Sequence, residues 1–81
     1  MLLAIDIGNS RIKAAVFEQN ILLEKFIFLK NELVEEMNNI LNSFVEINNV
    51  IISSVGAIEE KDFSFLTKIV NVTFVNHQFR F

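Results

Sequence analysis

The chain has 81 residues, of which 52% are apolar, with no cysteine and a net charge of −3. This size allows a single compact domain, the apolar fraction excludes a disordered segment, and the lack of cysteine excludes a disulfide-stapled scaffold. The longest uncharged, mostly apolar stretch, residues 47–58, is too short to span a bilayer, and Asp6 interrupts the apolar run that a signal peptide needs. We therefore expect a soluble cytoplasmic domain that does not bind membranes.

The first part of the sequence predicts three strands. Residues 2–7 and 12–17 are apolar, β-branched runs. They are joined by residues 8–11, Gly-Asn-Ser-Arg, a short connection that begins with the residue best suited to unusual backbone angles. This pattern predicts a hairpin. A second turn at residues 18–20 leads to a third strand over residues 21–29.

The remainder alternates between helix and strand patterns. Asn31 is expected to cap a helix whose first turns hold acids. The inward face of this helix has apolar residues at spacings of three, four and seven, namely Leu33, Val34, Met37, Ile40, Leu41, Phe44 and Val45. Residues 50–54 predict a buried strand because their apolar residues do not alternate. A shorter helix around Phe63, Leu66 and Ile69 and a last strand over residues 70–75 complete the chain.

The resulting element order is βββαβαβ. A meander of three strands followed by helical crossovers predicts an α/β fold, a mixed sheet with helices on its faces, as in the core of the ribonuclease-H-like folds.

Composition also bears on the partners of the domain. Residues 31–60 contain six acids and no base, which indicates a solvated face. Because the chain lacks a basic stripe that could neutralise many phosphates, we expect no nucleic-acid partner. The mean hydropathy of +0.43 and the nine phenylalanines are high for so small a domain. We expect another copy or a continuation of the chain to cover part of this apolar surface.

The residues best suited to chemistry lie at the first hairpin. Asp6 ends an apolar strand and faces Lys13 if the turn has four residues. The backbone N–H groups of the turn and the side chains of Asn9 and Ser10 can cradle a polyphosphate, and Asp6 can hold Mg²⁺ through water. In a purely structural alternative, Asp6 and Lys13 form an ion pair and Gly8 only makes the turn. The position of Asp6 favours the first interpretation, because burying a lone acid is unfavourable unless it is paired or bound to metal.

Residues 3–13, Leu-Ala-Ile-Asp-Ile-Gly-Asn-Ser-Arg-Ile-Lys, resemble the opening of type III pantothenate kinases, members of the acetate-and-sugar-kinase, chaperone and actin superfamily of ATPases. That family begins with a strand ending in D-x-G-N-T/S, and Ser10 keeps the hydroxyl where threonine is commoner. Residues 50–55, Val-Ile-Ile-Ser-Ser-Val, are similar to the family's strand and turn near the active cleft. The likeness covers all 81 residues in element order.

The resemblance implies an actin-like ATPase half-domain and phosphate transfer from ATP to pantothenate, the first step of coenzyme A biosynthesis. It implies that the first hairpin binds the ATP phosphates and that Asp6 is the metal-associated carboxylate. The segment so assigned consists of Asp6, Ile7, Gly8, Asn9, Ser10, Arg11, Ile12 and Lys13. Mg²⁺, a monovalent cation (K⁺ or NH₄⁺) and a homodimer are further implications of the family.

The second half of the family supplies a G-x-D-R segment, whose aspartate is the general base, as well as the adenosine-binding loops and the monovalent-cation site. The only aspartate after Asp6 is Asp62, with no glycine before it and no arginine after it. We therefore expect residues 1–81 to form a single N-terminal ATPase-type subdomain, truncated before the catalytic half. The general base is then expected beyond Phe81, no catalytic residue lies within the chain, and the 81 residues alone are inactive.

Two other functions fit the same fold. Holliday-junction resolvases and related ribonuclease-H-like nucleases also open with a strand ending in D-x-G, but two-metal nucleases need further carboxylates. The end of the fourth strand offers Ser53 and Ser54 instead, with the nearest acids at Glu59 and Glu60, and the net negative charge argues against DNA. The third alternative is a non-catalytic actin-like assembly module, which is favoured if the 81 residues are the entire natural product.

The remaining polar residues carry weaker signals. His77, the only histidine, has no partner nearby in the sequence and is expected at the surface. Gly56 is expected to serve backbone angles. Ser53 and Ser54 have no His/Asp arrangement to activate them, so neither is expected to act as a nucleophile.

Overall fold

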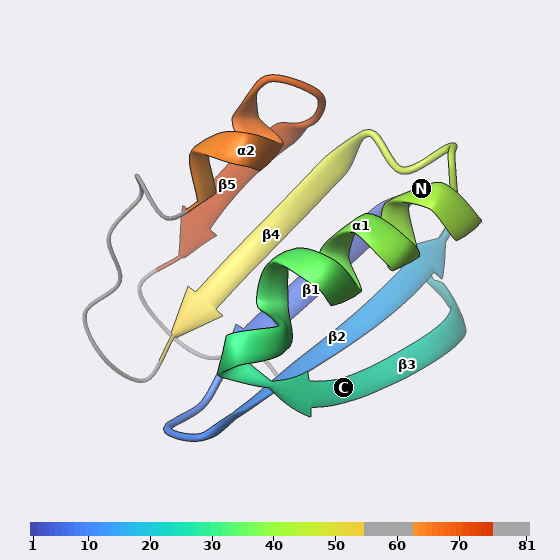
Figure 1. Ribbon diagram of the computed structural model, residues 1–81. Coiled ribbons are helices and arrows are strands. Elements are labelled where there is room, and N and C mark those ends of the chain that lie inside the picture. Colours follow the sequence, from blue (N-terminus) through green and yellow to red (C-terminus); the bar gives the residue numbers. More distant parts are fainter. Residues whose placement is uncertain (55–62, 76–81) are drawn as a thin grey trace.

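The computed structural model describes residues 1–54 and 63–75, which form one five-stranded sheet with helices packed against it (Figure 1). The strands are β1 (Leu2–Ile7), β2 (Arg11–Glu18), β3 (Ile21–Leu29), β4 (Asn49–Ser54) and β5 (Asn71–Val75). A 3₁₀ turn, η1 (Lys30–Glu32), leads into α1 (Leu33–Ser43), and α2 (Ser64–Thr67) comes between β4 and β5. The predicted order βββαβαβ is confirmed.

Strand β1 lies at the centre of the sheet, whose spatial order is β3-β2-β1-β4-β5. It pairs antiparallel with β2 and parallel with β4, and β4 pairs parallel with β5, so the predicted mixed sheet is confirmed. The hairpin has the predicted register, with Ile7 opposite Ile12 and Asp6 opposite Lys13. Since β1 and β4 run in the same direction, both strands end at the edge of the sheet where Asp6 lies.

The hydrophobic core fills the space between the sheet and the two described helices. Alternate residues of the central strands, such as Leu3, Ile5 and Ile12, pack in one cluster with Met37 of α1 and Leu66 of α2, and all of these are at most 1% exposed. Burial of each such side chain contributes about 1.5–3 kcal/mol. The Phe63 ring, just before α2, meets the Phe74 ring of β5 with centroids 5.8 Å apart. Both helices therefore cover the same face of the sheet (Figure 1).

The opposite face, which we call the open face, is covered by no helix or strand among residues 1–54 and 63–75. Its central residues Ala4, Ala15 and Ser53 are nevertheless buried. On it, Ile27 and Leu29 of β3 are 64% and 50% exposed. Such uncovered apolar surface is of the kind that the high hydropathy of the chain predicts.

The start of the first helix differs from the prediction. Asn31 does not cap it but lies inside η1. A different side chain makes a hydrogen bond at this start. The Oε1 atom of Glu32, the last residue of η1, accepts a hydrogen bond of 2.9 Å from the Leu29 N–H. That bond satisfies the backbone N–H of the residue before η1, as the glutamate of a capping box does.

Both helices are shorter than the apolar spacing predicts. α1 ends at Ser43 because Phe44 leaves the helical region, with φ −121° and ψ 73°, and the following Val45 is 81% exposed. Val34, within the helix, is also exposed (53%), so the buried face is narrower than the predicted one. α2 is a single turn, and Ile69 lies beyond it at 66% exposure. Neither described helix has the length and apolar character to cross a membrane.

Candidate functional site

The turn between β1 and β2 is held by its own backbone. The Gly8 N–H donates a hydrogen bond of 2.9 Å to the Arg11 carbonyl oxygen. The φ angle of Gly8 is not positive, so this residue does not have the unusual backbone angle that we predicted. Glycine is favoured at this position because the backbone of Arg11 approaches it closely. A Cβ atom built on Gly8 would lie 3.1 Å from the Arg11 carbonyl oxygen.

The tip of this turn projects into solvent. Asn9, Ser10 and Arg11 are exposed, and no hydrogen bond outside the helices and strands involves Asn9 or Ser10 in the part of the chain that the structure describes. Two side chains of the predicted segment turn away from solvent, because Ile7 and Ile12 belong to the core at 5% and 1% exposure. These two residues can reach a ligand only through backbone atoms.

The Asp6 carboxylate has a buried oxygen atom that lacks a hydrogen-bond partner. This atom is Oδ1, and the Asp6 side chain as a whole is half-buried. Although Lys13 lies directly opposite on β2, no ion pair joins the two among the described side chains, so the purely structural alternative lacks its main interaction. A buried acceptor left unsatisfied costs about 1–3 kcal/mol, which a bound cation or donor would remove.

Ser53 of β4 is the other neighbour of Asp6. The parallel register places it beside Asp6 on the sheet, and it is fully buried. Asp6 is thus flanked by a cation on β2 and a hydroxyl on β4. The end of β4 brings no second carboxylate to Asp6, and the described residues contain no group of three or more His, Cys, Asp or Glu side chains able to hold a metal.

This arrangement suits an anion bound together with a hard cation. A single carboxylate can hold Mg²⁺, whose remaining ligands are then phosphate oxygens and water. Exposed N–H groups and short polar side chains in a tight turn suit phosphate oxygens. The structure brings Asp6, Lys13 and the turn residues together at one edge of the sheet, as the sequence predicts. Gly56, Glu59, Glu60, Asp62 and His77 lie outside the described residues.

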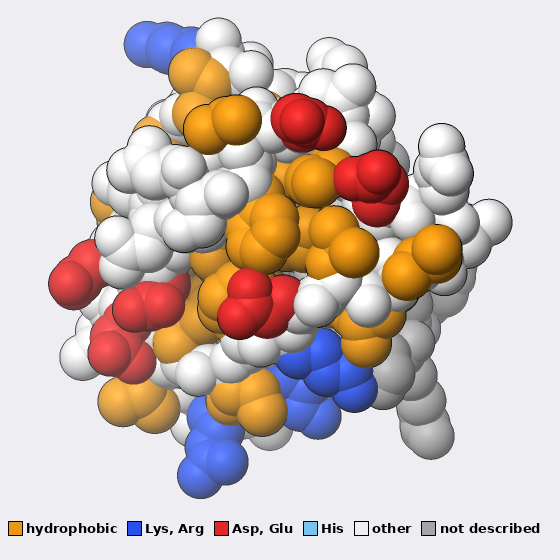
Figure 2. Space-filling view, turned by 90° about the vertical axis from the view of Figure 1, so that its right-hand side faces the viewer, with side chains coloured by type: hydrophobic (Ala, Val, Ile, Leu, Met, Phe, Trp, Pro, Cys, Tyr) orange, Lys and Arg blue, Asp and Glu red, His pale blue; other side chains and the backbone are white. Residues whose placement is uncertain are grey.

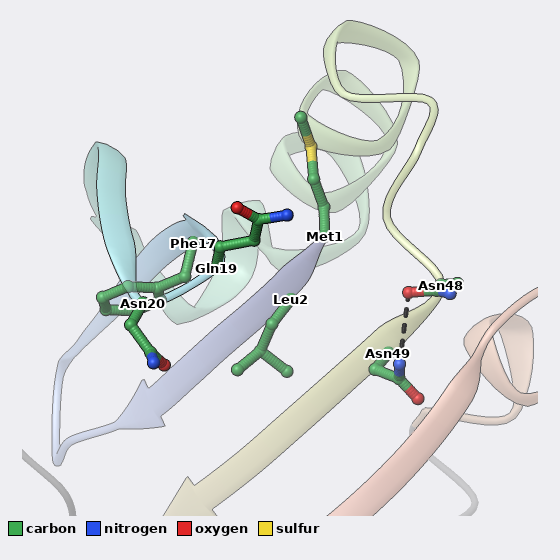
Figure 3. A pocket seen from close by; sticks show the side chains of 7 residues that line it. All are labelled: Met1, Leu2, Phe17, Gln19, Asn20, Asn48 and Asn49. Carbon is green, nitrogen blue, oxygen red and sulfur yellow. Dashed lines mark hydrogen bonds between the residues drawn. The ribbon is translucent and has the colours of Figure 1, made fainter.

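A separate pocket of about 470 Å³ lies at the opposite end of the sheet (Figure 3). Carboxamides line it, from Gln19 and Asn20 in the β2–β3 turn and from Asn48 and Asn49 before and in β4, around the apolar side chains of Met1, Leu2 and Phe17. The Asn49 Nδ2 atom donates to Asn48 Oδ1 at 3.1 Å. Positive φ angles at Gln19 and Asn20 (51° and 68°) make the tight turn there. Leu2 precedes Asp6 by four strand residues, about 13 Å, so this pocket is distinct from the hairpin site.

Comparison with known proteins identifies a matching family model and similar sequences. The family model described as type III pantothenate kinase matches residues 2–79. The type III pantothenate kinase of Flavobacterium johnsoniae is 44% identical over 78 residues, which cover 96% of this chain and 32% of that protein. That of Flavobacterium psychrophilum is 37% identical over 81 residues, covering 100% of this chain and 34% of that protein. The chain therefore spans about a third of the length of the curated relatives it matches.

Proposed function

The chain belongs to the type III pantothenate kinase family, and on this premise we propose that its first hairpin binds the phosphates of ATP in an enzyme that phosphorylates pantothenate. One observation carries this proposal most directly. The Oδ1 atom of Asp6 is buried and unpartnered, beside a tight turn whose exposed groups are free of other hydrogen bonds among the described residues.

The phosphate contacts are proposed to come from the turn. Asn9 and Ser10 supply backbone N–H groups and side-chain donors, while Arg11 and Lys13 supply positive charge from the exposed side of β2. Gly8 allows the close approach of the chain that shapes the turn. Ile7 and Ile12 anchor the two ends of the turn in the core.

Asp6 is proposed to associate with Mg²⁺. The fit rests on the unpartnered carboxylate oxygen, a hard donor of the type that Mg²⁺ prefers. Mg²⁺ would neutralise charge that develops on the transferred phosphoryl group. Asp6 would hold the ion close to the turn, and the turn donors would fix the orientation of the phosphate chain.

The acceptor side of the reaction is assigned to no residue of this chain. The G-x-D-R segment that the family resemblance implies for the general base does not occur in this sequence. We therefore propose that residues 1–81 bind phosphate but do not transfer it by themselves. A cytoplasmic homodimer stays part of the proposal for the whole enzyme.

An amide NMR titration of the ¹⁵N-labelled chain with Mg-pyrophosphate and Mg-ATP tests the site. We expect chemical-shift changes concentrated at residues 8–13. In the variant Asp6→Asn, we expect most of the chemical-shift change that depends on Mg²⁺ to be lost. Residues 19, 20, 48 and 49 of the distant pocket serve as internal controls that should not respond. A folded spectrum without any response at the hairpin, or with its main response in the distant pocket, would overturn the proposal.

A further inference from the structure

Three cations share the open face of the sheet near the hairpin. Ile12 and Ala14 of β2 belong to the core cluster, so their neighbours Arg11 and Lys13 point to the opposite face. Lys25 of β3 pairs with Ala15, the next residue of β2 on that face. All three cations are exposed, and no ion pair engages any of them among the described residues.

Their spacing forms a row that leads away from the phosphate-binding turn. Arg11 and Lys13 are two residues apart on one strand, which separates them by about 7 Å. Lys25 is diagonal to Lys13 across the antiparallel pair, because Lys13 pairs with Ile27, and such diagonal positions lie about 7–8 Å apart. Arg11, Lys13 and Lys25, which we call the cation row, therefore extend from the turn over the open face.

The charge of this row contrasts with the rest of the molecule. The chain carries −3 overall, yet Asp6 is the one acid on the open face among the described strand residues. Figure 2 shows several basic side chains low on the side of the molecule that lies at the right of Figure 1, with an acidic side chain next to them. Like charges at this spacing repel one another, so an anion with several negative charges would bind along the row.

We propose that Lys25 is a binding residue of the phosphate site, and that through it the cation row favours a chain of three phosphates over a shorter one. This inference rests on the proposed function, because it places the near end of the phosphate chain at the turn. Lysine suits the end of the phosphate chain that lies away from the turn, since its ammonium group is a mobile point charge on a flexible stem. A nucleic-acid backbone is a poor match, because duplex binding relies on many phosphate contacts and this row offers three cations.

The test measures the affinity of the chain for Mg-tripolyphosphate and Mg-pyrophosphate at low ionic strength, where exposed charges are least screened. We expect Lys25→Gln to weaken tripolyphosphate binding about threefold to fivefold, as for an exposed charge pair, and to leave pyrophosphate binding unchanged. Lys25→Arg should retain the wild-type preference. Lys68→Gln removes the same charge from an exposed lysine after α2 and should alter neither affinity.

Each result has a distinct meaning. If the wild-type chain binds neither anion, the proposed function fails and this inference fails with it. If the wild type binds both anions but Lys25→Gln changes nothing, or weakens both equally, only the role of Lys25 is refuted. Equal effects of Lys25→Gln and Lys68→Gln would show a response to net charge alone, and a short DNA duplex that binds as tightly as tripolyphosphate would refute the choice of ligand.

Discussion

Replacing Asp6 with asparagine should change stability and binding in opposite directions. The carboxylate oxygen Oδ1 is buried without a hydrogen-bond partner, so the folded protein without ligand retains an unsatisfied acceptor that bears part of a full charge. Asn has nearly the same shape but no charge. Asn still places a polar atom at this position, so the substitution removes only the part of the cost that depends on charge. Because the side chain is only half-buried, we take this part to be at most about 1 kcal/mol, the lower end of the cost of an unsatisfied group. For a domain of this size, a gain of about 1 kcal/mol would raise Tm by roughly 4–8 °C, which sets the upper limit of the expected shift.

Thermal unfolding with and without Mg-pyrophosphate measures both effects in one assay. A ligand present at a hundred times its Kd stabilises the wild-type fold by about 2.7 kcal/mol, and Asp6→Asn should lose most of this increment. The exposed Glu35 of α1 provides a control, since Glu35→Gln also removes one negative charge but lies away from the hairpin. A lower Tm for Asp6→Asn in the absence of ligand would refute the reasoning, because it would mean that the carboxylate already has a stabilising partner.

Three further substitutions test the turn, the core and the helix start. Gly8→Ala should destabilise the fold by about 1 kcal/mol and weaken pyrophosphate binding, because its Cβ would approach the Arg11 carbonyl oxygen to 3.1 Å; unchanged urea unfolding and unchanged affinity would contradict this. Met37→Ala should lower the free energy of unfolding by about 2–5 kcal/mol, since Met37 is fully buried, whereas Val45→Ala at an 81% exposed position should stay within about 0.5 kcal/mol. Glu32→Ala removes the acceptor of the Leu29 N–H and should cost about 1 kcal/mol, whereas Asn31→Ala should have little effect; the reverse order in urea unfolding would restore Asn31 as the cap.

Strand patterns and turn length made much of the fold predictable. The apolar runs around residues 8–11 have one four-residue connection, and this fixes the register that sets Asp6 opposite Lys13. The helix boundaries were less predictable, because apolar spacing does not reveal where the backbone turns away. Val34 and Val45 fit the helical spacing, yet both are exposed. Asn31 was the best capping residue by type, but Glu32 reaches the free N–H from within the 3₁₀ turn.

At the candidate site, sequence reasoning found the residues of the hairpin but not those that tertiary pairing adds. Ser53 is fully buried beside Asp6 only because β4 pairs parallel with β1. Lys25 lies on the same face as Arg11 and Lys13 because β3 pairs with β2 in a register that places Lys25 opposite Ala15. The register shift in this pairing comes after Ala15, between Val16 and Phe17. A signal for Lys25 was available in principle, since alternation along a predicted third strand assigns its faces once the hairpin register is known.

The central place of β1 also sets an order of events in time. The pairing of β1 with β2 joins near neighbours in the chain, and a hairpin of this kind closes within about 1–10 μs. The pairing of β1 with β4 brings Leu2 to Asn49, and contacts between such distant segments form later because loop closure opposes them. The turn at residues 8–11 therefore takes shape before Ser53 arrives beside Asp6. We therefore expect the turn to form while Asp6 is still hydrated, before β4 completes the sheet beside it.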